Sequence, residues 1–174
     1  MVLAGAGSGK TRVLTMRIAH LITQGVSPFH ILALTFTNKA AAEMRERVDK
    51  MAGPAAKDVW LFTFHAFCAR VLRRDIDKLG QYSNNFAIYD TTDTKNLIKQ
   101  ILKEMNLDEK RFQPKSVLSI ISSAKDKYEG PEAFAKQHSN ETDWKMSRIA
   151  KVYEKYALKL RSANALDFDD IIYH

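Results

Sequence analysis

The hydrophobic pattern of the first 80 residues alternates between helix and strand spacing. Apolar residues three and four positions apart predict a helix over Thr11–Gln24, and an unbroken apolar and β-branched run over Ile31–Thr37 predicts a strand buried on both faces. A second helix ends at Gly53, a strand spans Val59–Thr63, and a third helix spans His65–Lys78. This alternation predicts an α/β fold with a parallel sheet.

The pattern changes after Gly80, where helical spacing dominates. Only Phe86–Tyr89 has strand character there, and helices are expected to start near Thr92 and at Pro114. The longest helical stretch carries an apolar seam made of Met146, Ile149, Tyr153, Tyr156 and Leu160. We predict that this seam is core, and that a second, mostly helical unit begins after Gly80.

Charge adds a candidate partner to this picture. The 174 residues include 27 Lys+Arg and 20 Asp+Glu, a net charge of +7, and residues 1–80 hold 12 of the basic and 6 of the acidic residues. A basic first half favours an anionic partner such as nucleic acid. The single cysteine, Cys68, excludes an internal disulfide framework and a multi-cysteine metal site, and it suits a cytoplasmic protein.

A glycine-rich segment near the N-terminus has the composition of a phosphate-binding loop. It consists of Ala4-Gly5-Ala6-Gly7-Ser8-Gly9-Lys10-Thr11. The glycines let backbone N–H groups face phosphates, Lys10 can meet the β and γ oxygens, and Thr11 can ligate Mg²⁺. Ala4 replaces the first glycine of the usual pattern, and Lys10 excludes the dinucleotide fingerprint. The helix after the loop favours a nucleoside triphosphate over a flexible turn.

Two predicted strands end in polar and aromatic residues. The first leads into Thr35-Phe36-Thr37-Asn38-Lys39 and the second into Thr63-Phe64-His65. Ligands bind at strand ends in such sheets, and Phe36 could stack on a base. The residues alone leave two alternatives open for the first segment, a nucleic-acid contact or a capped helix with a core phenylalanine. His65 has no acid or nucleophile beside it, so we expect a structural or ligand-contacting role.

Three carboxylates gather near the C-terminus at Asp167, Asp169 and Asp170. A helix cap followed by an acidic first turn is favoured over a metal site, because no further ligand-spaced residue completes a metal set. No hydrophobic strand ends in an Asp-Glu pair that could activate water for nucleotide hydrolysis.

Taken in order, four motifs closely resemble the superfamily 1 DNA helicases of the UvrD, Rep and PcrA group, most of all the PcrA members. They are Ala-Gly-Ala-Gly-Ser-Gly-Lys-Thr at 4–11, Ala-Leu-Thr-Phe-Thr-Asn-Lys-Ala-Ala at 33–41, Thr-Phe-His at 63–65 and Leu-Asp-Phe-Asp-Asp at 166–170. The resemblance covers essentially the whole chain, including Ile-Ser-Ser-Ala-Lys at 121–125, and an alanine at position 4 is usual in this group.

The resemblance implies a RecA-like ATP-binding domain, 1A, interrupted by an inserted helical domain, 1B. The first part of 1A would cover residues 1–85, 1B would cover 86–163, and the chain would return to 1A over 164–174. The expected fold class is therefore α/β, an incomplete RecA-like P-loop sheet with an inserted, mostly α-helical domain.

The resemblance also implies roles for individual residues. Ala4 to Thr11 would bind ATP with Arg12 close to the nucleotide, Lys10 and Thr11 would be the catalytic residues, and Thr11 would hold Mg²⁺. The single-strand path would be lined by Thr35, Phe36, Thr37, Asn38 and Lys39, with Thr63 and His65 also on the strand. The helical domain would touch the duplex at single/double-strand junctions.

Members of this group couple ATP hydrolysis to 3′–5′ movement along single-stranded DNA, in DNA repair and replication. We expect this chain to be a fragment, because only Met1–Ala4 precede the loop and an Asp-Glu element is absent. It should bind ATP weakly, if at all, and should need the remaining helicase domains for hydrolysis and unwinding. The alternatives are a nucleic-acid-binding module with a vestigial loop, or a P-loop kinase.

Overall fold

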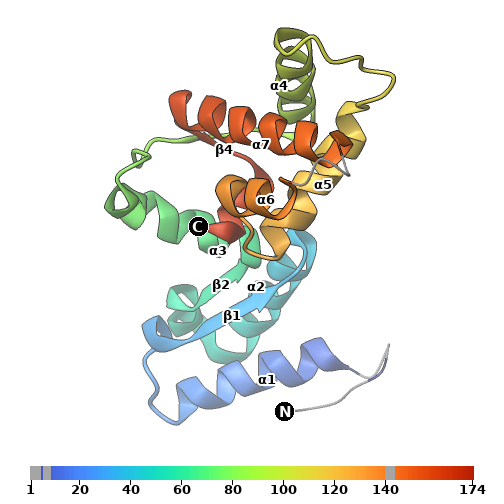
Figure 1. Cartoon of the computed structure of the whole chain (residues 1–174). Helices are drawn as coiled ribbons and strands as arrows, with labels where there is room; N and C mark the ends of the chain where they lie inside the picture. Colours follow the sequence, from blue (N-terminus) through green and yellow to red (C-terminus); the bar gives the residue numbers. More distant parts are fainter. Residues whose placement is uncertain (1–4, 6–8, 140–143) are drawn as a thin grey trace. The chain divides into compact units, whose positions relative to one another are not determined.

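The computed structural model describes Gly5, residues 9–139 and residues 144–174. It is a mixed α/β structure, mostly helical, with short parallel strands (Figure 1). The chain divides into two compact units, residues 1–67 and 68–174, and the helix over Phe64–Asp75 contains the boundary between them. Each unit has its own core and is described by itself.

Before the boundary helix, the described residues of the first unit form two α-helices, two short 3₁₀ helices and two strands. Its elements are α1 (Lys10–Thr23), η1 (Pro28–His30), β1 (Leu32–Thr35), α2 (Asn38–Ala52), η2 (Gly53–Asp58), β2 (Trp60–Thr63) and the start of α3 (Phe64–Asp75). The predicted helices and strands of this region are therefore confirmed to within a few residues. The apolar stub Met1–Ala4 lies outside the described residues.

The two strands of the first unit pair in parallel, and α2 forms the connection between them. Leu32 lies opposite Trp60, and Thr35 lies opposite Thr63, so both strands end at the same level. A buried cluster joins α1 and α2 to the strands, and it consists of Ile18, Ile31, Met44, Val48, Ala56, Val59 and Leu61. The Arg45 guanidinium fastens α2 to the sheet by donating to the Leu61 carbonyl at 3.0 Å.

One sequence expectation about β1 is wrong. The strand was expected to be buried on both faces, yet Leu32 is 45% exposed and Ala33, Leu34 and Thr35 are only half-buried. The physical reason is the size of the sheet: with two strands among the described residues, both strands are edge strands and α2 covers only part of their surface.

The second unit is mainly helical. After the end of α3 it contains η3 (Ile76–Leu79), β3 (Ala87–Ile88), α4 (Thr91–Glu104), α5 (Pro114–Asp126), α6 (Pro131–Gln137), α7 (Trp144–Ser162), β4 (Ala165–Leu166) and α8 (Phe168–Tyr173). The predicted seam of α7 is core, because Ile149, Tyr153, Tyr156 and Leu160 are all buried. Met146 packs at its edge as a partly buried residue.

The two short strands of the second unit connect segments far apart in the sequence. Ala87 pairs in parallel with Ala165, and Ile88 pairs with Leu166. A second, smaller core of this unit, formed by Leu72, Ile76, Phe86, Leu166 and Ile171, surrounds the pairing. Residues 87–88 and 165–166 thereby bring together the two ends of the α4–α7 segment (Figure 1). None of the described helices combines the length and apolar character needed to cross a membrane.

Candidate phosphate loop and strand-end surface

The described part of the glycine-rich segment leads directly into a helix. Gly9 precedes α1 with a φ of 81°, a left-handed conformation that glycine adopts without steric cost. Lys10 is the first residue of α1, and its ammonium donates to the Gly5 carbonyl at 3.1 Å. The Lys10 side chain therefore points back toward Gly5. The loop residues Ala4, Ala6, Gly7 and Ser8 lie outside the described residues.

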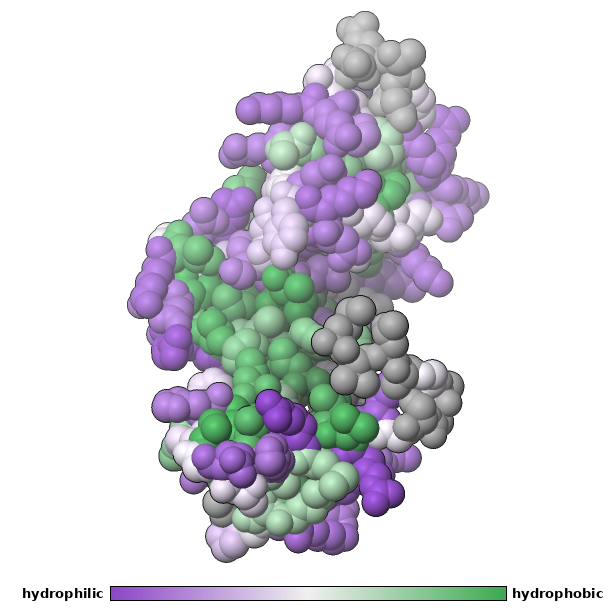
Figure 2. Space-filling view, turned by 90° about the horizontal axis from the view of Figure 1, so that it is seen from below, coloured by the Kyte–Doolittle hydropathy of each residue, from purple (hydrophilic) through white to green (hydrophobic). Residues whose placement is uncertain are grey.

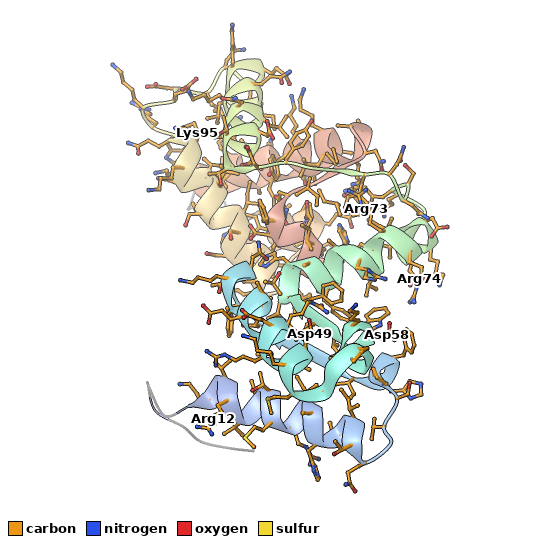
Figure 3. All side chains as sticks on the ribbon, turned by 180° about the vertical axis from the view of Figure 1, so that it is seen from behind. Arg12, Asp49, Asp58, Arg73, Arg74 and Lys95 are labelled. Carbon is orange, nitrogen blue, oxygen red and sulfur yellow. The ribbon has the colours of Figure 1, made fainter. Side chains whose placement is uncertain are left out.

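The N-terminus of α1, the helix after the loop, carries no negatively charged side chain. The first turn of α1 contains no acidic residue, and its free N–H groups carry partial positive charge. Thr11 is half-buried and Arg12 is exposed at the start of the helix (Figure 3). Backbone N–H groups, an ammonium and a hydroxyl are the donors and ligand that a phosphate with Mg²⁺ requires.

A pocket of about 410 Å³ lies between α1 and α2. It is lined by Arg12, Thr15, Met16, Arg47, Lys50 and Met51. Three of these side chains are cationic and none is acidic, although Lys50 also pairs with Glu46 at 2.6 Å and Arg47 with Glu43 at 3.9 Å. Arg12 thus belongs to a locally basic surface beside the loop, which suits an anionic ligand.

The ends of β1 and β2 form a second group of candidate residues. Because Thr35 and Thr63 are partners in the parallel register, the residues that follow them lie side by side. Phe36 and Phe64 are accordingly neighbours, with ring centroids 5.6 Å apart and ring planes inclined by 43°. Phe36 is 88% exposed and Phe64 is 43% exposed. We call Thr35–Lys39 together with Thr63–His65 the strand-end surface.

Two helix N-termini add positive potential to the strand-end surface. Thr37 caps α2 by accepting from the Ala40 N–H at 3.1 Å, and the Thr63 hydroxyl accepts from the Ala66 N–H in α3 at 3.2 Å. Neither helix has an acidic residue in its first turn, and Lys39 lies in the first turn of α2. The surface thus combines exposed aromatic rings with a positive field, the combination that single-stranded nucleic acids bind.

These contacts resolve the two alternatives for the segment after β1 only in part. The helix cap at Thr37 is confirmed. A core position for Phe36 is contradicted by its exposure of 88%, since the ring lies outside the buried cluster of the first unit, at the end of an edge strand. Asn38, Lys39 and His65 are also exposed, whereas Thr63 is buried. The sequence did not single out Phe64, although its position at the end of the neighbouring strand was a usable signal.

The C-terminal carboxylates do form the predicted helix cap. Asp167 precedes α8, and Asp167 and Asp170 make a capping box in which each carboxylate accepts from the other residue's N–H. No group of three or more His, Cys, Asp or Glu residues suited to a metal ion occurs in the part of the chain that the structure describes. The sequence missed the partner of these carboxylates, Lys125 of α5, which lies 2.7 Å from Asp167 and 2.6 Å from Asp170.

Hydrophobic residues are also exposed in the first unit (Figure 2). Val13, Leu14 and Met16 of α1 each leave about half of their surface open, at 51%, 50% and 52%. Neighbouring exposed apolar side chains of this kind are typical of a surface that packs against other protein.

Comparison with known proteins identifies the family. The model of the UvrD/REP helicase N-terminal domain matches residues 1–174. The chain is 53% identical over 173 residues to the ATP-dependent DNA helicase PcrA of Bacillus subtilis (strain 168), and 48% identical over 173 residues to PcrA of Staphylococcus aureus (strain NCTC 8325). Each match covers 99% of this chain and 23% of the relative, so the chain spans about a quarter of the relatives' length. The chain therefore belongs to the UvrD/REP helicase family, whose N-terminal domain it matches from end to end.

Proposed function

We propose that this chain is the ATP- and DNA-binding N-terminal portion of an ATP-dependent 3′–5′ DNA helicase or translocase. Its relatives carry the name ATP-dependent DNA helicase, and all four motifs lie in the matched region. The proposed substrate is single-stranded DNA and its junctions with duplex, and the proposed partners within the parent chain are the remaining helicase domains. The exposed apolar side chains of α1 support packing against such domains.

Mg²⁺ and ATP fit the residues of the loop. Gly9 already has the left-handed backbone that the tight turn into a helix requires, and the Lys10 ammonium donates to the Gly5 carbonyl at 3.1 Å. Lys10 would hold the β and γ phosphates, Thr11 would hold Mg²⁺, and Arg12 would lie near the nucleotide. When bound, ATP supplies the free energy of hydrolysis of its terminal phosphate.

Within this proposal, residues 1–85 form the first part of a RecA-like domain, 86–163 form the inserted helical domain, and 164–174 return to the first domain. The pairing of β3 with β4 supports the insertion, because it holds the entry and the exit of the helical segment together. The only Asp-Glu pair of the chain, Asp108-Glu109, follows helix α4 and not a strand. We therefore propose that the chain alone binds ATP weakly, if at all, and neither hydrolyses ATP nor unwinds DNA.

The observation that carries the DNA-binding proposal is the exposure of Phe36 beside Phe64. A phenylalanine ring exposed to water lacks about 1.5–3 kcal/mol of the stabilisation that burial provides, and stacking on a base provides a comparable stabilisation. Thr35, Thr37, Asn38, Thr63 and His65 supply polar groups around the rings, and Lys39 supplies a charge for the phosphates.

Binding of a fluorescent oligothymidylate, followed by anisotropy, tests this proposal. Phe36→Ala should weaken binding roughly 5- to 100-fold, because stacking contributes about 1–3 kcal/mol per base. Phe29→Ala is the matched control, since Phe29 is also an exposed aromatic residue of the first unit, at 63%, but it precedes β1 and therefore lies at the opposite end of the strand. Equal losses in both variants would contradict the proposal.

A further inference from the structure

Lys125, Tyr156, Asp167 and Asp170 form one buried polar group in the second unit, which we call the Lys125 cluster. Lys125 comes from α5, Tyr156 from α7, and the two aspartates from the turn into α8. Lys125, Asp167 and Asp170 are each 5% exposed, and Tyr156 is fully buried. Three helices therefore meet at a single ammonium group.

The charges of the Lys125 cluster do not balance. Its one ammonium lies 2.7 Å from Asp167 Oδ2 and 2.6 Å from Asp170 Oδ1, so two carboxylates share one cation. With all three groups ionised, the cluster carries one uncompensated negative charge in a buried site, where the cost of charge is high. Taking up one proton would remove that excess.

The hydrogen bonds indicate which carboxylate takes the proton. Asp167 accepts from Lys125, from the Tyr156 hydroxyl at 2.8 Å and from the Asp170 N–H at 2.8 Å. Asp170 accepts from Lys125 and from the Asp167 N–H at 3.2 Å, without a side-chain hydroxyl. Since each donor stabilises the ionised form, Asp170 is the less stabilised carboxylate of the two.

The pKa directions agree with this order. Burial, reinforced by the charge of Asp167, raises the pKa of Asp170 to about 6, and Lys125 offsets only part of that rise. Burial is also the largest single effect on Asp167 and acts against its ionisation, but Lys125, the Asp170 N–H and the Tyr156 hydroxyl together outweigh it and lower the pKa of Asp167. The ammonium of Lys125 itself keeps its proton, because the two carboxylates outweigh its burial and raise its pKa.

Other titratable groups lie around Asp170, and their effects on stability must be distinguished from that of Asp170. The tyrosines facing the same pocket, Tyr82 and Tyr153, stay neutral because burial raises the pKa of each phenol, as it does for Tyr156. Charged and titratable side chains also come from α6, α7 and α8, namely Glu132, Arg161, Asp169, Tyr173 and His174. Burial lowers the pKa of His174, so protonation of His174 opposes folding, whereas protonation of Asp170 favours it.

We propose that the Lys125 cluster is a proton-sensitive lock on the start of α8: Asp170 takes up one proton when the turn over Asp167–Asp170 is folded, which removes the uncompensated charge and stabilises the folded turn relative to the unfolded chain. The lock uses none of the residues proposed to bind ATP or DNA. Because the folded pKa is raised above the unfolded value, stability of the turn rises as the pH falls through about 6 and stops rising near the unfolded pKa of 3.8.

NMR on the 174-residue chain tests the lock. The ¹³C shift of the Asp170 carboxyl should titrate with a midpoint near pH 6. Amide exchange should be read at Asp170 and His174, whose N–H groups donate to Asp167 Oδ1 and to the Asp170 carbonyl. In a His174→Gln variant, which removes the opposing titration of that imidazole, the protection factors of these two amides, corrected for intrinsic exchange, should increase about tenfold between pH 6.5 and pH 5.

Three substitutions test whether Asp170 is the group that takes up the proton. Asp170→Asn should abolish the rise in protection, whereas Asp169→Asn, one residue away on the same helix, should retain it. Lys125→Met should move the Asp170 midpoint to higher pH, because the balancing charge is lost. A carboxyl midpoint near 4 in the wild-type chain, protection that falls with acid, or an unchanged rise in Asp170→Asn would overturn the proposal. The wild-type carboxyl titration decides the matter even where a variant fails to fold.

Discussion

Lys10 and Lys39 occupy equivalent places in the first unit, each in the first turn of a helix without an acidic residue. A cation at a helix N-terminus is unfavourable by about 0.3–1 kcal/mol, because it repels the positive end of the helix dipole. An anion bound beside the lysine reverses that penalty. Both residues are therefore placed where a phosphate would stabilise the protein, one beside the glycine loop and one on the strand-end surface.

Substitution of either lysine should weaken binding of only one of the two proposed ligands. Lys10→Ala should weaken binding of a fluorescent ATP analogue with Mg²⁺ by about tenfold or more, since a charge-assisted contact contributes about 1.5–3 kcal/mol, and should leave oligothymidylate binding unchanged. Lys39→Ala should do the opposite. Equal nucleotide binding in wild type and Lys10→Ala would favour a vestigial loop, and a steady ATPase activity that Lys10→Ala abolishes would contradict the inactivity proposed for this chain.

Sequence reasoning at this scale succeeded where a role depends on neighbours in the chain. The cap at Asp167 was predictable because its partner, Asp170, is three residues away. The partnership with Lys125 was not, since 42 residues separate Lys125 from Asp167 and only the fold brings them together. The exposure of Phe36 was equally undetermined, because an aromatic residue after a strand can be core or surface until the covering elements are known.

At the scale of elements, Asn164 joins the two ends of the α4–α7 segment. It follows α7 with a φ of 46°, and its carbonyl accepts from the Ala87 N–H at 2.9 Å. Its side-chain amide accepts from the Ser83 N–H at 2.8 Å and donates to Ser83 Oγ at 2.7 Å and to Asn85 at 3.0 Å. Asparagine is among the few residues that tolerate this left-handed backbone conformation. One residue therefore supplies both the turn after α7 and the side-chain hydrogen bonds to Ser83 and Asn85.

Two substitutions at Asn164 separate these contributions. Asn164→Gly keeps the left-handed backbone accessible and removes the side-chain hydrogen bonds, so it should lower the free energy of unfolding by about 1–2 kcal/mol. Asn164→Ala loses the hydrogen bonds and strains the backbone, and should cost about 1 kcal/mol more. Urea denaturation, followed by the NMR signals of residues in β3 and β4, measures the free energy of unfolding of both variants. Identical losses would show that the backbone conformation contributes nothing.

Element types were largely predictable because periodicity is local, and the helices α1, α2, α4, α5 and α7 all correspond to predicted ones. Which strands pair with each other was harder to predict from the sequence. Residues 86–89 had strand character, but no pattern near residue 165 indicated that two residues there would pair with them, because a two-residue strand such as β4 has no periodicity of its own.

At the scale of the whole molecule, the residues proposed to bind ATP and DNA belong to the first unit, and the second unit supplies most of the described helices. The strand-end surface and the loop both lie within residues 1–67. This placement puts both groups in the unit with the greater net positive charge for its length, since residues 1–67 hold 8 Lys+Arg against 4 Asp+Glu and residues 68–174 hold 19 against 16. It also locates the expected DNA contacts in one compact unit, whose parallel strands set their spacing.

Titration of the ¹⁵N-labelled chain with oligothymidylate tests the central claim, that the aligned ends of β1 and β2 bind single-stranded DNA. We expect the largest amide shifts to cluster at Thr35–Lys39 and Thr63–His65, and the amide of Phe29, at the other end of β1, to stay unchanged. Saturable binding whose shifts spare both strand ends, or shifts confined to residues 68–174, would contradict it.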